Sequence, residues 1–433
     1  MILSLLSGVI LGELILHNFS FYDSFFAIVT LFSSLAQEGW ILKTLAFVIL
    51  AGSIMALIEK SGGVGGFVHY VLDEKSFVKS ERSALMLSYI LGVLIFIETS
   101  ITALVSGAVG KPLCDRYKIP HAKLAMVCDS TSAPIGSLIV LNGYGALLLG
   151  LISTQISLGY IESNATEMLI SALKFNFYAI FALIMTFLFI YFGLSFGPMK
   201  TTLYKESQKQ TEFKNITSMS YMLLPVLLMI VLVFVFLYIT GSGDIFKGSG
   251  SSAIFYTMLT TFLFTLAYFV STKNMSLKTW SLTAIKGAKE FTPISFILLF
   301  AFAIGNVTGE LKTGLYLSSL ASTNVSVYFL AGIIFLLSSL ISFSTGTSWG
   351  TFSIMIPIAV PMAVGMDANI ALCIGAVISG GVFGDHCSPI SDTTIISSMA
   401  SDCEVIEHVK TQLPYALISA AAAFIMFVLF SFL

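Results

Sequence analysis

The chain has 433 residues, of which 57% are hydrophobic and only 10% carry a formal charge. Its mean hydropathy is +0.95, well above that of an average soluble domain, so the composition excludes a water-soluble fold. We expect an all-α polytopic membrane protein that is surrounded by lipid, is not an enzyme, and binds neither a cofactor nor nucleic acid. The five cysteines form no C-x-x-C pair, which argues against a zinc site and against a disulfide framework.

Spanning helices are predicted wherever about 20 mostly apolar residues follow one another. The first, Met1–Leu16, has no basic flank and no A-x-A cleavage site, so we expect it to be retained rather than removed as a signal peptide. Ordinary spans are predicted near residues 2–17, 41–59, 169–195, 217–240, 253–271, 290–309 and 412–433.

Four further apolar stretches are too long, or too rich in Gly, Pro, Ser and Thr, to be simple spanning helices. They lie near residues 84–110, 123–155, 328–364 and 368–401. We expect these stretches to hold the functional groups, because non-helical backbone at membrane depth is tolerated only inside protein or beside a polar cavity.

Basic residues in the loops predict how the chain is oriented. Four of them precede the stretch 84–110 and four follow it, so the positive-inside rule places both flanks in the cytoplasm and predicts a re-entrant hairpin. Residues 313–409 contain no Lys or Arg, so the stretch 328–364 is predicted to be a hairpin that opens outward. If both hairpins were instead ordinary spans, this charge distribution would be disturbed. With both hairpins in place, 17 of the 21 basic residues lie on the cytoplasmic side of the cell (inner) membrane, and the exceptions are Lys43, Lys174, Lys247 and Lys312.

The resulting order of elements predicts two inverted repeats, an architecture found in many secondary transporters. Weak sequence symmetry supports it, because Ser132-Ala133-Pro134-Ile135 corresponds to Cys387-Ser388-Pro389-Ile390. The first predicted repeat is residues 1–195, with a re-entrant hairpin at 84–112 and a broken helix at 123–155. Residues 196–252 form a cytoplasmic loop and a linking helix. The second predicted repeat is residues 253–433, with a re-entrant hairpin at 328–364 and a broken helix at 368–401.

Four polar clusters mark the predicted breaks, at residues 98–102, 129–134, 346–351 and 384–393. They bring helix breakers together with hydroxyl or carboxylate oxygens, and such hard oxygen ligands suit Na⁺. The candidate cation- or substrate-coordinating residues are Thr99, Ser100, Thr102, Ser130, Thr131, Ser132, Thr347, Ser348, Thr351, Ser388, Ser391 and Thr393.

The acidic residues of these clusters are Glu98, Asp129, Asp385 and Asp392. An ionised carboxylate near the bilayer centre costs about 2.5–3.5 kcal/mol, so such residues are usually functional. Removal from water favours the protonated carboxyl group and a bound cation favours the ionised one, so each group can exchange H⁺ for Na⁺. We expect Asp129 and Asp385 to be the main carriers, with Glu98 as their rival.

Simpler structural roles compete with ion binding at several positions. Ser and Thr hydroxyls can bond the carbonyl four residues earlier in a helix, and Asp385 and Asp392 can cap helix N-termini. His386 is expected to form hydrogen bonds rather than to bind a metal, since no second ligand stands at metal-binding spacing. Glu13 in the first helix is expected to contact a neighbouring element.

Three motifs resemble the NhaC-type Na⁺/H⁺ antiporter family of the ion transporter superfamily. They are Phe343–Thr351 (FSTGTSWGT), Phe383–Thr394 (FGDHCSPISDTT) and His408–Tyr415 (HVKTQLPY), and residues 123–134 look like a counterpart in the first half. The resemblance implies sodium–proton exchange, a scaffold with a mobile transport domain, and a homodimer that works as an elevator. The family often has an Asp-Asp pair in the first hairpin, where this chain has Ile97-Glu98-Thr99-Ser100.

Other functions remain open from the sequence. A Na⁺- or H⁺-coupled carrier of a small organic acid or amino acid would use the same cation site, with Asn142, Tyr144, Asn306 or Trp349 around the solute. An intramembrane aspartyl protease would use Asp244 of a GxGD pattern, but this residue falls in a predicted outside loop. A channel is disfavoured because inverted broken-helix repeats are typical of alternating access.

Overall fold

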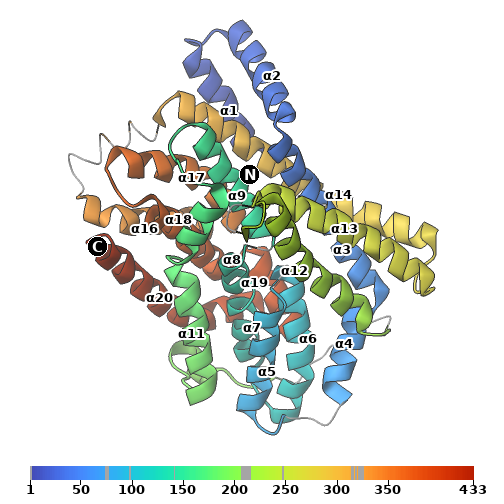
Figure 1. Cartoon of the computed structure of the whole chain (residues 1–433). Helices are drawn as coiled ribbons and strands as arrows, with labels where there is room; N and C mark the ends of the chain where they lie inside the picture. The colour runs from blue at the N-terminus through green and yellow to red at the C-terminus, as the bar shows by residue number, and fades with distance from the viewer. Residues whose placement is uncertain are drawn as a thin grey trace.

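The computed structural model describes residues 2–73, 78–96, 99–140, 142–205, 216–245, 248–313, 316, 319 and 326–433. Over these residues the chain consists of α-helices, one short 3₁₀ helix and connecting turns, and they contain no β-strand. Figure 1 shows the helices bundled into one assembly, with α1 and α2 at one end and α5, α6 and α11 at the other. The all-α prediction is confirmed.

The helices range from short segments to full spans. In the first half they are α1 (Ile2–Leu16), α2 (Phe21–Gln37), α3 (Gly39–Ser61), α4 (Gly63–Asp73), α5 (Glu81–Leu94), α6 (Thr99–Tyr117), α7 (His121–Ser130), α8 (Ala133–Leu138), α9 (Gly143–Ser157), α10 (Ala165–Leu173) and α11 (Phe177–Phe192). After the 3₁₀ helix Gly197–Thr201 they are α12 (Ser220–Thr240), α13 (Gly250–Ser271), α14 (Leu277–Glu310), α16 (Val327–Thr345), α17 (Ser348–Gly365), α18 (Ile370–Cys387), α19 (Asp392–Ser401) and α20 (Val405–Phe430).

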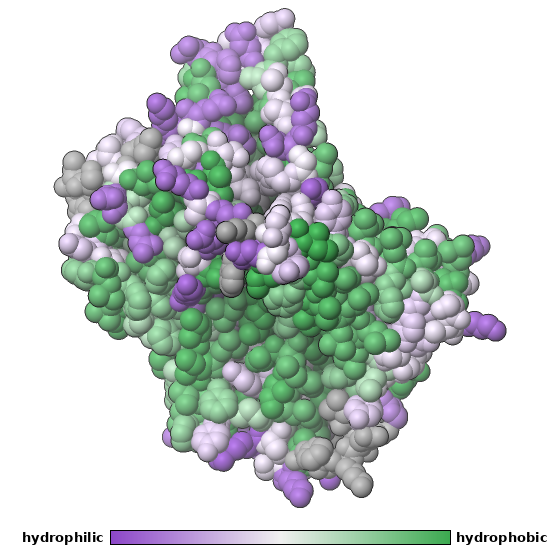
Figure 2. All heavy atoms as spheres, in the orientation of Figure 1, coloured by the Kyte–Doolittle hydropathy of each residue, from purple (hydrophilic) through white to green (hydrophobic). Residues whose placement is uncertain are grey.

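The surface fits a lipid environment. In the described part of the chain, ten helical stretches are long and apolar enough to cross a membrane, and α1 is a shorter apolar helix. Figure 2 shows hydrophobic side chains over the broad middle of one face and hydrophilic side chains towards its upper and lower ends. The chain is therefore a multi-pass membrane protein.

Both predicted broken helices are interrupted in the structure. The first breaks between α7 and α8, at residues 131–132, and the second breaks between α18 and α19, at residues 388–391. The first helix also has an interruption that the sequence did not predict, between α8 and α9, where Asn142 caps α9 by accepting from the Gly145 N–H.

Both predicted hairpins are found as pairs of helices, α5 with α6 and α16 with α17. The turn of the second pair depends on Gly346, whose φ of +66° suits a residue without a side chain. A Cβ there would also lie 2.8 Å from Ile390, so this turn touches the break between α18 and α19. Whether the hairpins enter and leave the membrane on one side remains a prediction.

Three expectations about simple spans are wrong in detail. The predicted span 169–195 is divided into α10 and α11, because Asn176 between them turns its amide to Ser137 of α8. The predicted span 290–309 is the second part of the longer α14, which a Ser276 cap begins. Helix α2 was not predicted, because its polar residues interrupt the apolar run on which the prediction depended.

The hairpins of each half pack against the broken helix of the other half. Helix α6 of the first hairpin packs on α19, and α17 of the second hairpin packs on α9. The first contact is close, because a Cβ on Gly107 would lie 2.6 Å from the Cβ of Ala400. This interlocking places the two breaks, about 260 residues apart in sequence, beside each other in the interior (Figure 1).

Candidate functional site

Asp129 lies at the end of α7, directly before the first break, and is completely buried. Its Oδ2 accepts hydrogen bonds from Gln412 Nε2 at 2.9 Å and from Thr394 Oγ1 at 3.3 Å. His408 Nε2 lies 3.4 Å from the same oxygen. The other oxygen, Oδ1, has no hydrogen-bond partner among the described residues, which is an unusual state for a buried carboxyl group.

His408 has hydrogen-bond partners at both ring nitrogens. Its Nε2 lies 2.8 Å from Gln412 Oε1, and its Nδ1 lies 2.9 Å from the Ser398 hydroxyl. That hydroxyl also lies 2.7 Å from the carbonyl of Thr394, which can only accept. The single hydroxyl proton can serve either neighbour, so the His408 ring can carry one proton or two without losing a partner.

His386 lies between the two halves of the chain and forms the hydrogen bonds expected of it. Its Nδ1 is 2.6 Å from the Tyr178 hydroxyl and its Nε2 is 3.2 Å from the Ser130 hydroxyl. Its backbone carbonyl accepts from Gln412 Nε2 at 2.5 Å. The described residues contain no group of three or more His, Cys, Asp and Glu that could hold a metal ion. We call Asp129, Ser130, His386, His408 and Gln412 the histidine cluster.

Asp385 directly precedes His386, but its side chain contacts a different set of residues. Its Oδ2 accepts from the Ser348 hydroxyl at 2.7 Å, and Ser348 Oγ lies 2.8 Å from the Tyr144 hydroxyl. Ser348 opens α17, whose N-cap Thr347 accepts from Gly350 N–H. The positive end of this helix therefore points towards a carboxyl group, a favourable arrangement. Asp385 Oδ1 is buried and has no partner in the described part of the chain.

The second break positions Asp392 as the first residue of α19. Asp392 Oδ1 accepts from the N–H of Thr393 at 2.8 Å, but the N-cap position of α19 belongs to Ser391. The Ser391 and Thr393 hydroxyls lie 3.0 Å apart. Ser388 donates to the carbonyl of Phe343 at 2.8 Å and thereby ties the break to the second hairpin.

Three of the predicted ligand hydroxyls donate to nearby backbone carbonyls. Thr131 donates to a carbonyl four residues earlier at 2.8 Å, Ser132 to one three residues earlier at 2.9 Å, and Thr351 to one four residues earlier at 3.0 Å. These are the local hydrogen bonds of the simpler structural role. The oxygen of a donating hydroxyl keeps its lone pairs, so cation binding by these residues stays a prediction.

The first hairpin is described only in part. Thr102 donates to the carbonyl of Ile95 and so holds the end of α5. Thr99 lines a cavity that is described below. Glu98, the rival proton carrier, lies outside the described residues, and the Ser100 side chain is likewise not described.

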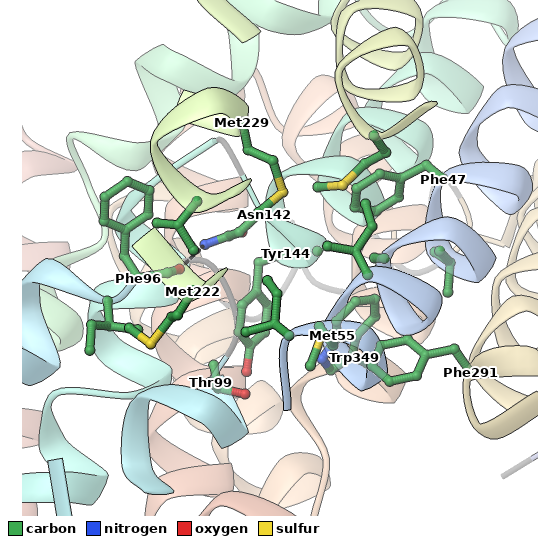
Figure 3. Close-up of a pocket in the computed structure, with 18 of the residues that line it drawn as sticks. Phe47, Met55, Phe96, Thr99, Asn142, Tyr144, Met222, Met229, Phe291 and Trp349 are labelled. Atoms are coloured by element: carbon green, nitrogen blue, oxygen red, sulfur yellow. Dashed lines mark hydrogen bonds between the residues drawn. The ribbon is translucent and has the colours of Figure 1, made fainter. Parts of the chain in front are cut away.

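A cavity of about 220 Å³ lies where the hairpins meet α3, α12 and α14 (Figure 3). Apolar side chains form most of its wall, and the methionines and aromatic residues among them include Met55, Met222, Met229, Phe47 and Phe291. Figure 3 shows these side chains converging on the space from several helices.

The polar lining of this cavity comes from the hairpins and the helix breaks. It consists of Thr99, Asn142, Tyr144, Trp349 and Asp392. The Asn142 amide donates to the carbonyl of Phe96 at 3.2 Å, as the dashed line in Figure 3 shows. Asn306, another residue considered for a solute site, bonds within α14 instead.

Two residues of the histidine cluster, and two side chains that contact it, were not predicted to have a role. His408 and Gln412 stood in the motif that carried the family resemblance, and Thr394 stood beside the predicted ligands. The spacing of His408 and Gln412, four residues apart, puts both on one face of α20 and could have indicated a shared partner. Tyr178 gave no sequence signal.

Comparison with known protein families identifies the family of this chain. The model of the Na⁺/H⁺ antiporter family matches residues 143–432. The chain belongs to this family. As an antiporter-family protein with multiple apolar helices it is a transporter rather than an enzyme, and the resemblance seen in the sequence is confirmed.

Individual relatives agree with this assignment. The chain is 33% identical to an uncharacterized protein of Haemophilus influenzae, over all of this chain and 87% of that protein. It is also 33% identical to the malate-2H⁺/Na⁺-lactate antiporter of Bacillus subtilis, over 25% of this chain and 23% of that protein. The fold is similar to the crystal structure of the YdaH transporter of Alcanivorax borkumensis, with a TM-score of 0.62 and 13% identity over 94% and 87% of the two chains.

Proposed function

We propose that this antiporter-family protein exchanges Na⁺ for H⁺ across the cell (inner) membrane. The main support is that both predicted carriers, Asp129 and Asp385, are buried beside a helix break and each keeps one oxygen without a partner among the described residues. A buried carboxylate oxygen in this state is stabilised by binding a proton or a cation.

The surroundings of the two carboxyl groups favour proton transfer at Asp129 and Na⁺ binding at Asp385. Around Asp129, the Gln412 amide and the His408 ring place nitrogen donors against Oδ2. Hydrogen atoms there repel a metal cation, whereas the His408 ring offers a second place for a proton. The histidine cluster therefore suits proton transfer better than Na⁺ binding.

Asp385 has the surroundings of a Na⁺ site. Its carboxyl group accepts a hydrogen bond from the Ser348 hydroxyl, which in turn contacts the Tyr144 hydroxyl. These groups supply the hard oxygen atoms that suit an alkali-metal cation. Asp392 and the hydroxyls of Ser391 and Thr393 follow in the same break and complete the set of candidate ligands. Because Asp385 and His386 are neighbours, binding at one site can move the other.

The mechanism that we propose is alternating access by an elevator-type transport domain. This domain would contain the two hairpins and the two broken helices, and the scaffold would contain α3, α12, α13 and α14. The reciprocal packing of α6 on α19 and of α17 on α9 is the arrangement expected for two inverted repeats. We further propose that the protein forms a homodimer through the scaffold, as the family resemblance implies.

Purified protein in proteoliposomes tests the exchange directly. With a pH-sensitive dye inside, an outward Na⁺ gradient should acidify the lumen without any organic solute, and Li⁺ and K⁺ should be compared in the same assay. Empty liposomes and the Asp385→Asn variant are the controls. A proton signal that appears only when an organic solute is added would reject pure Na⁺/H⁺ exchange.

A second candidate is a Na⁺- or H⁺-coupled carrier of a small organic acid or amino acid. The observation that favours it is the cavity of about 220 Å³, which is far larger than a bare cation needs. One relative, from Bacillus subtilis, is a malate-2H⁺/Na⁺-lactate antiporter.

A further inference from the structure

The cavity beside the helix breaks has room for an organic molecule. Its volume is about 220 Å³, and an apolar protein cavity of about 150 Å³ is enough to bind benzene. The space therefore accommodates a solute with roughly ten non-hydrogen atoms, on the order of a benzene ring with a short side chain. Na⁺ at Asp385 would not fill it.

The wall of the cavity is suited to an apolar body. Met55, Met222 and Met229 project from α3 and α12, and Phe47 and Phe291 add aromatic surface (Figure 3). Methionine side chains are flexible and polarizable, so they adapt to apolar groups of different shape. Pockets of this kind obtain specificity from a few polar groups.

The one charged group among the described lining residues is the Asp392 carboxyl. No Lys, Arg or His of the described part of the chain lines the cavity with it. Two electron-rich rings, Tyr144 and Trp349, line the same cavity, with their centroids 5.5 Å apart. A cavity that contains one carboxylate and aromatic faces attracts an ammonium group and disfavours a free organic anion.

The cavity wall is connected directly to the proposed Na⁺ site. The Tyr144 hydroxyl lies 2.8 Å from Ser348 Oγ, and Ser348 donates to Asp385 at 2.7 Å. Trp349 packs so closely on Gly143 that a Cβ there would lie 2.8 Å from the indole ring. A solute that displaces either ring therefore acts on the start of α17 and on the hydrogen bond to Asp385.

We propose that this cavity binds a small organic solute that carries a protonated amino group on an apolar body, with the amino group at Asp392 and the rings of Tyr144 and Trp349. The amino group can belong to a simple amine or to an amino acid. The proposal rests on the transporter function proposed above, because the solute lies beside the same helix breaks, and it names the chemical class of that solute.

Matched ligands distinguish an amine from an acid with the same body. Binding to the purified full-length protein is measured by isothermal titration calorimetry with 2-phenylethylamine, L-phenylalanine and 3-phenylpropionate, and with isopentylamine, L-leucine and 4-methylpentanoate. We expect the amine, the amino acid or both to bind in at least one series, at least tenfold more tightly than the corresponding acid. The comparison of amine with amino acid shows whether a carboxylate adds to binding.

Two variants test the location of the site. Asp392→Asn should weaken binding of the amino compound at least tenfold, whereas Asp367→Asn, at an acidic residue that is not part of the lining, should not. Ala51→Phe should abolish binding by filling the cavity without removing a polar group, since Ala51 lines it. The Ala51 variant keeps the test decisive if Asp392→Asn does not fold.

Three results would overturn the proposal: equal or tighter binding of the acids, no binding of any amino compound in either series, or unchanged binding in both Asp392→Asn and Ala51→Phe. Sodium-driven proton movement without solute is measured on the same preparations. Solute binding without Na⁺/H⁺ exchange would reject the proposed exchange and support the solute site. Exchange without solute binding would support the proposed exchange and reject the solute site.

Discussion

The hydroxyl of Ser348 is the group whose removal should affect Na⁺ most selectively. It donates to Asp385 Oδ2 at 2.7 Å and is completely buried. A hydrogen bond to a charged group contributes about 1.5–3 kcal/mol, and each 1.4 kcal/mol changes an equilibrium constant about tenfold. Ser348→Ala should therefore raise the apparent Km for Na⁺ by about ten- to a hundredfold.

The same helix offers a matched control for this variant. Ser353 is equally buried, but its hydroxyl donates to the carbonyl of Trp349 within α17 at 2.9 Å. Ser353→Ala should change the apparent Km for Na⁺ by less than about threefold, because such local hydrogen bonds contribute little. Both variants are compared in proteoliposomes at several Na⁺ concentrations, with reconstituted protein quantified. Equal Km values for Ser348→Ala and the wild type, or equal impairment of the two variants, would refute the assignment of Ser348.

Three further predictions address topology, packing and the histidine cluster. A single cysteine in place of Lys118 should be labelled only from the cytoplasm, and one in place of Asn324 only from outside. Labelling of position 118 from outside would contradict the re-entrant hairpin predicted in the first half. Gly107→Val should destabilise the protein by about 1–3 kcal/mol because it separates α6 from α19, and an unchanged thermal unfolding midpoint would contradict this. Gln412→Leu removes a hydrogen-bond donor to Asp129. It should lower the thermal unfolding midpoint and slow exchange, since a buried acceptor left without a partner costs about 1–3 kcal/mol. Native stability together with native exchange would exclude a role for Gln412 at Asp129.

The helix breaks could be predicted from the sequence because the signals are local. The run from Asp129 to Pro134 and the Ser388-Pro389 pair combine helix breakers with polar side chains, and the structure interrupts both helices there. The interruption before Asn142 was missed, because no proline marks it and because one of its contacts, to the carbonyl of Phe96, comes from the distant segment that follows α5.

The roles of individual hydroxyls could not be predicted from the sequence. Ser130 and Ser132 are equivalent in the pattern, yet Ser130 contacts His386 and Ser132 donates to the nearby carbonyl of Asp129. What separates them is the direction in which each side chain points once the two halves have packed together. The partners of Asp129 lie more than 260 residues away in sequence, so only the tertiary fold reveals them.

We propose that Asp385 binds Na⁺ in exchange for a proton that is transferred with the help of Asp129. The most direct measurement compares sodium-driven proton movement in proteoliposomes that contain wild-type protein, Asp385→Asn, Asp129→Asn or Glu98→Gln, each with its amount and orientation determined. The amide keeps the size of the carboxyl group but cannot titrate or supply charge, so Asp385→Asn and Asp129→Asn should both abolish exchange. Near-native, pH-dependent exchange in both of these variants, together with an inactive Glu98→Gln, would contradict the account and transfer the proton-carrying role to Glu98.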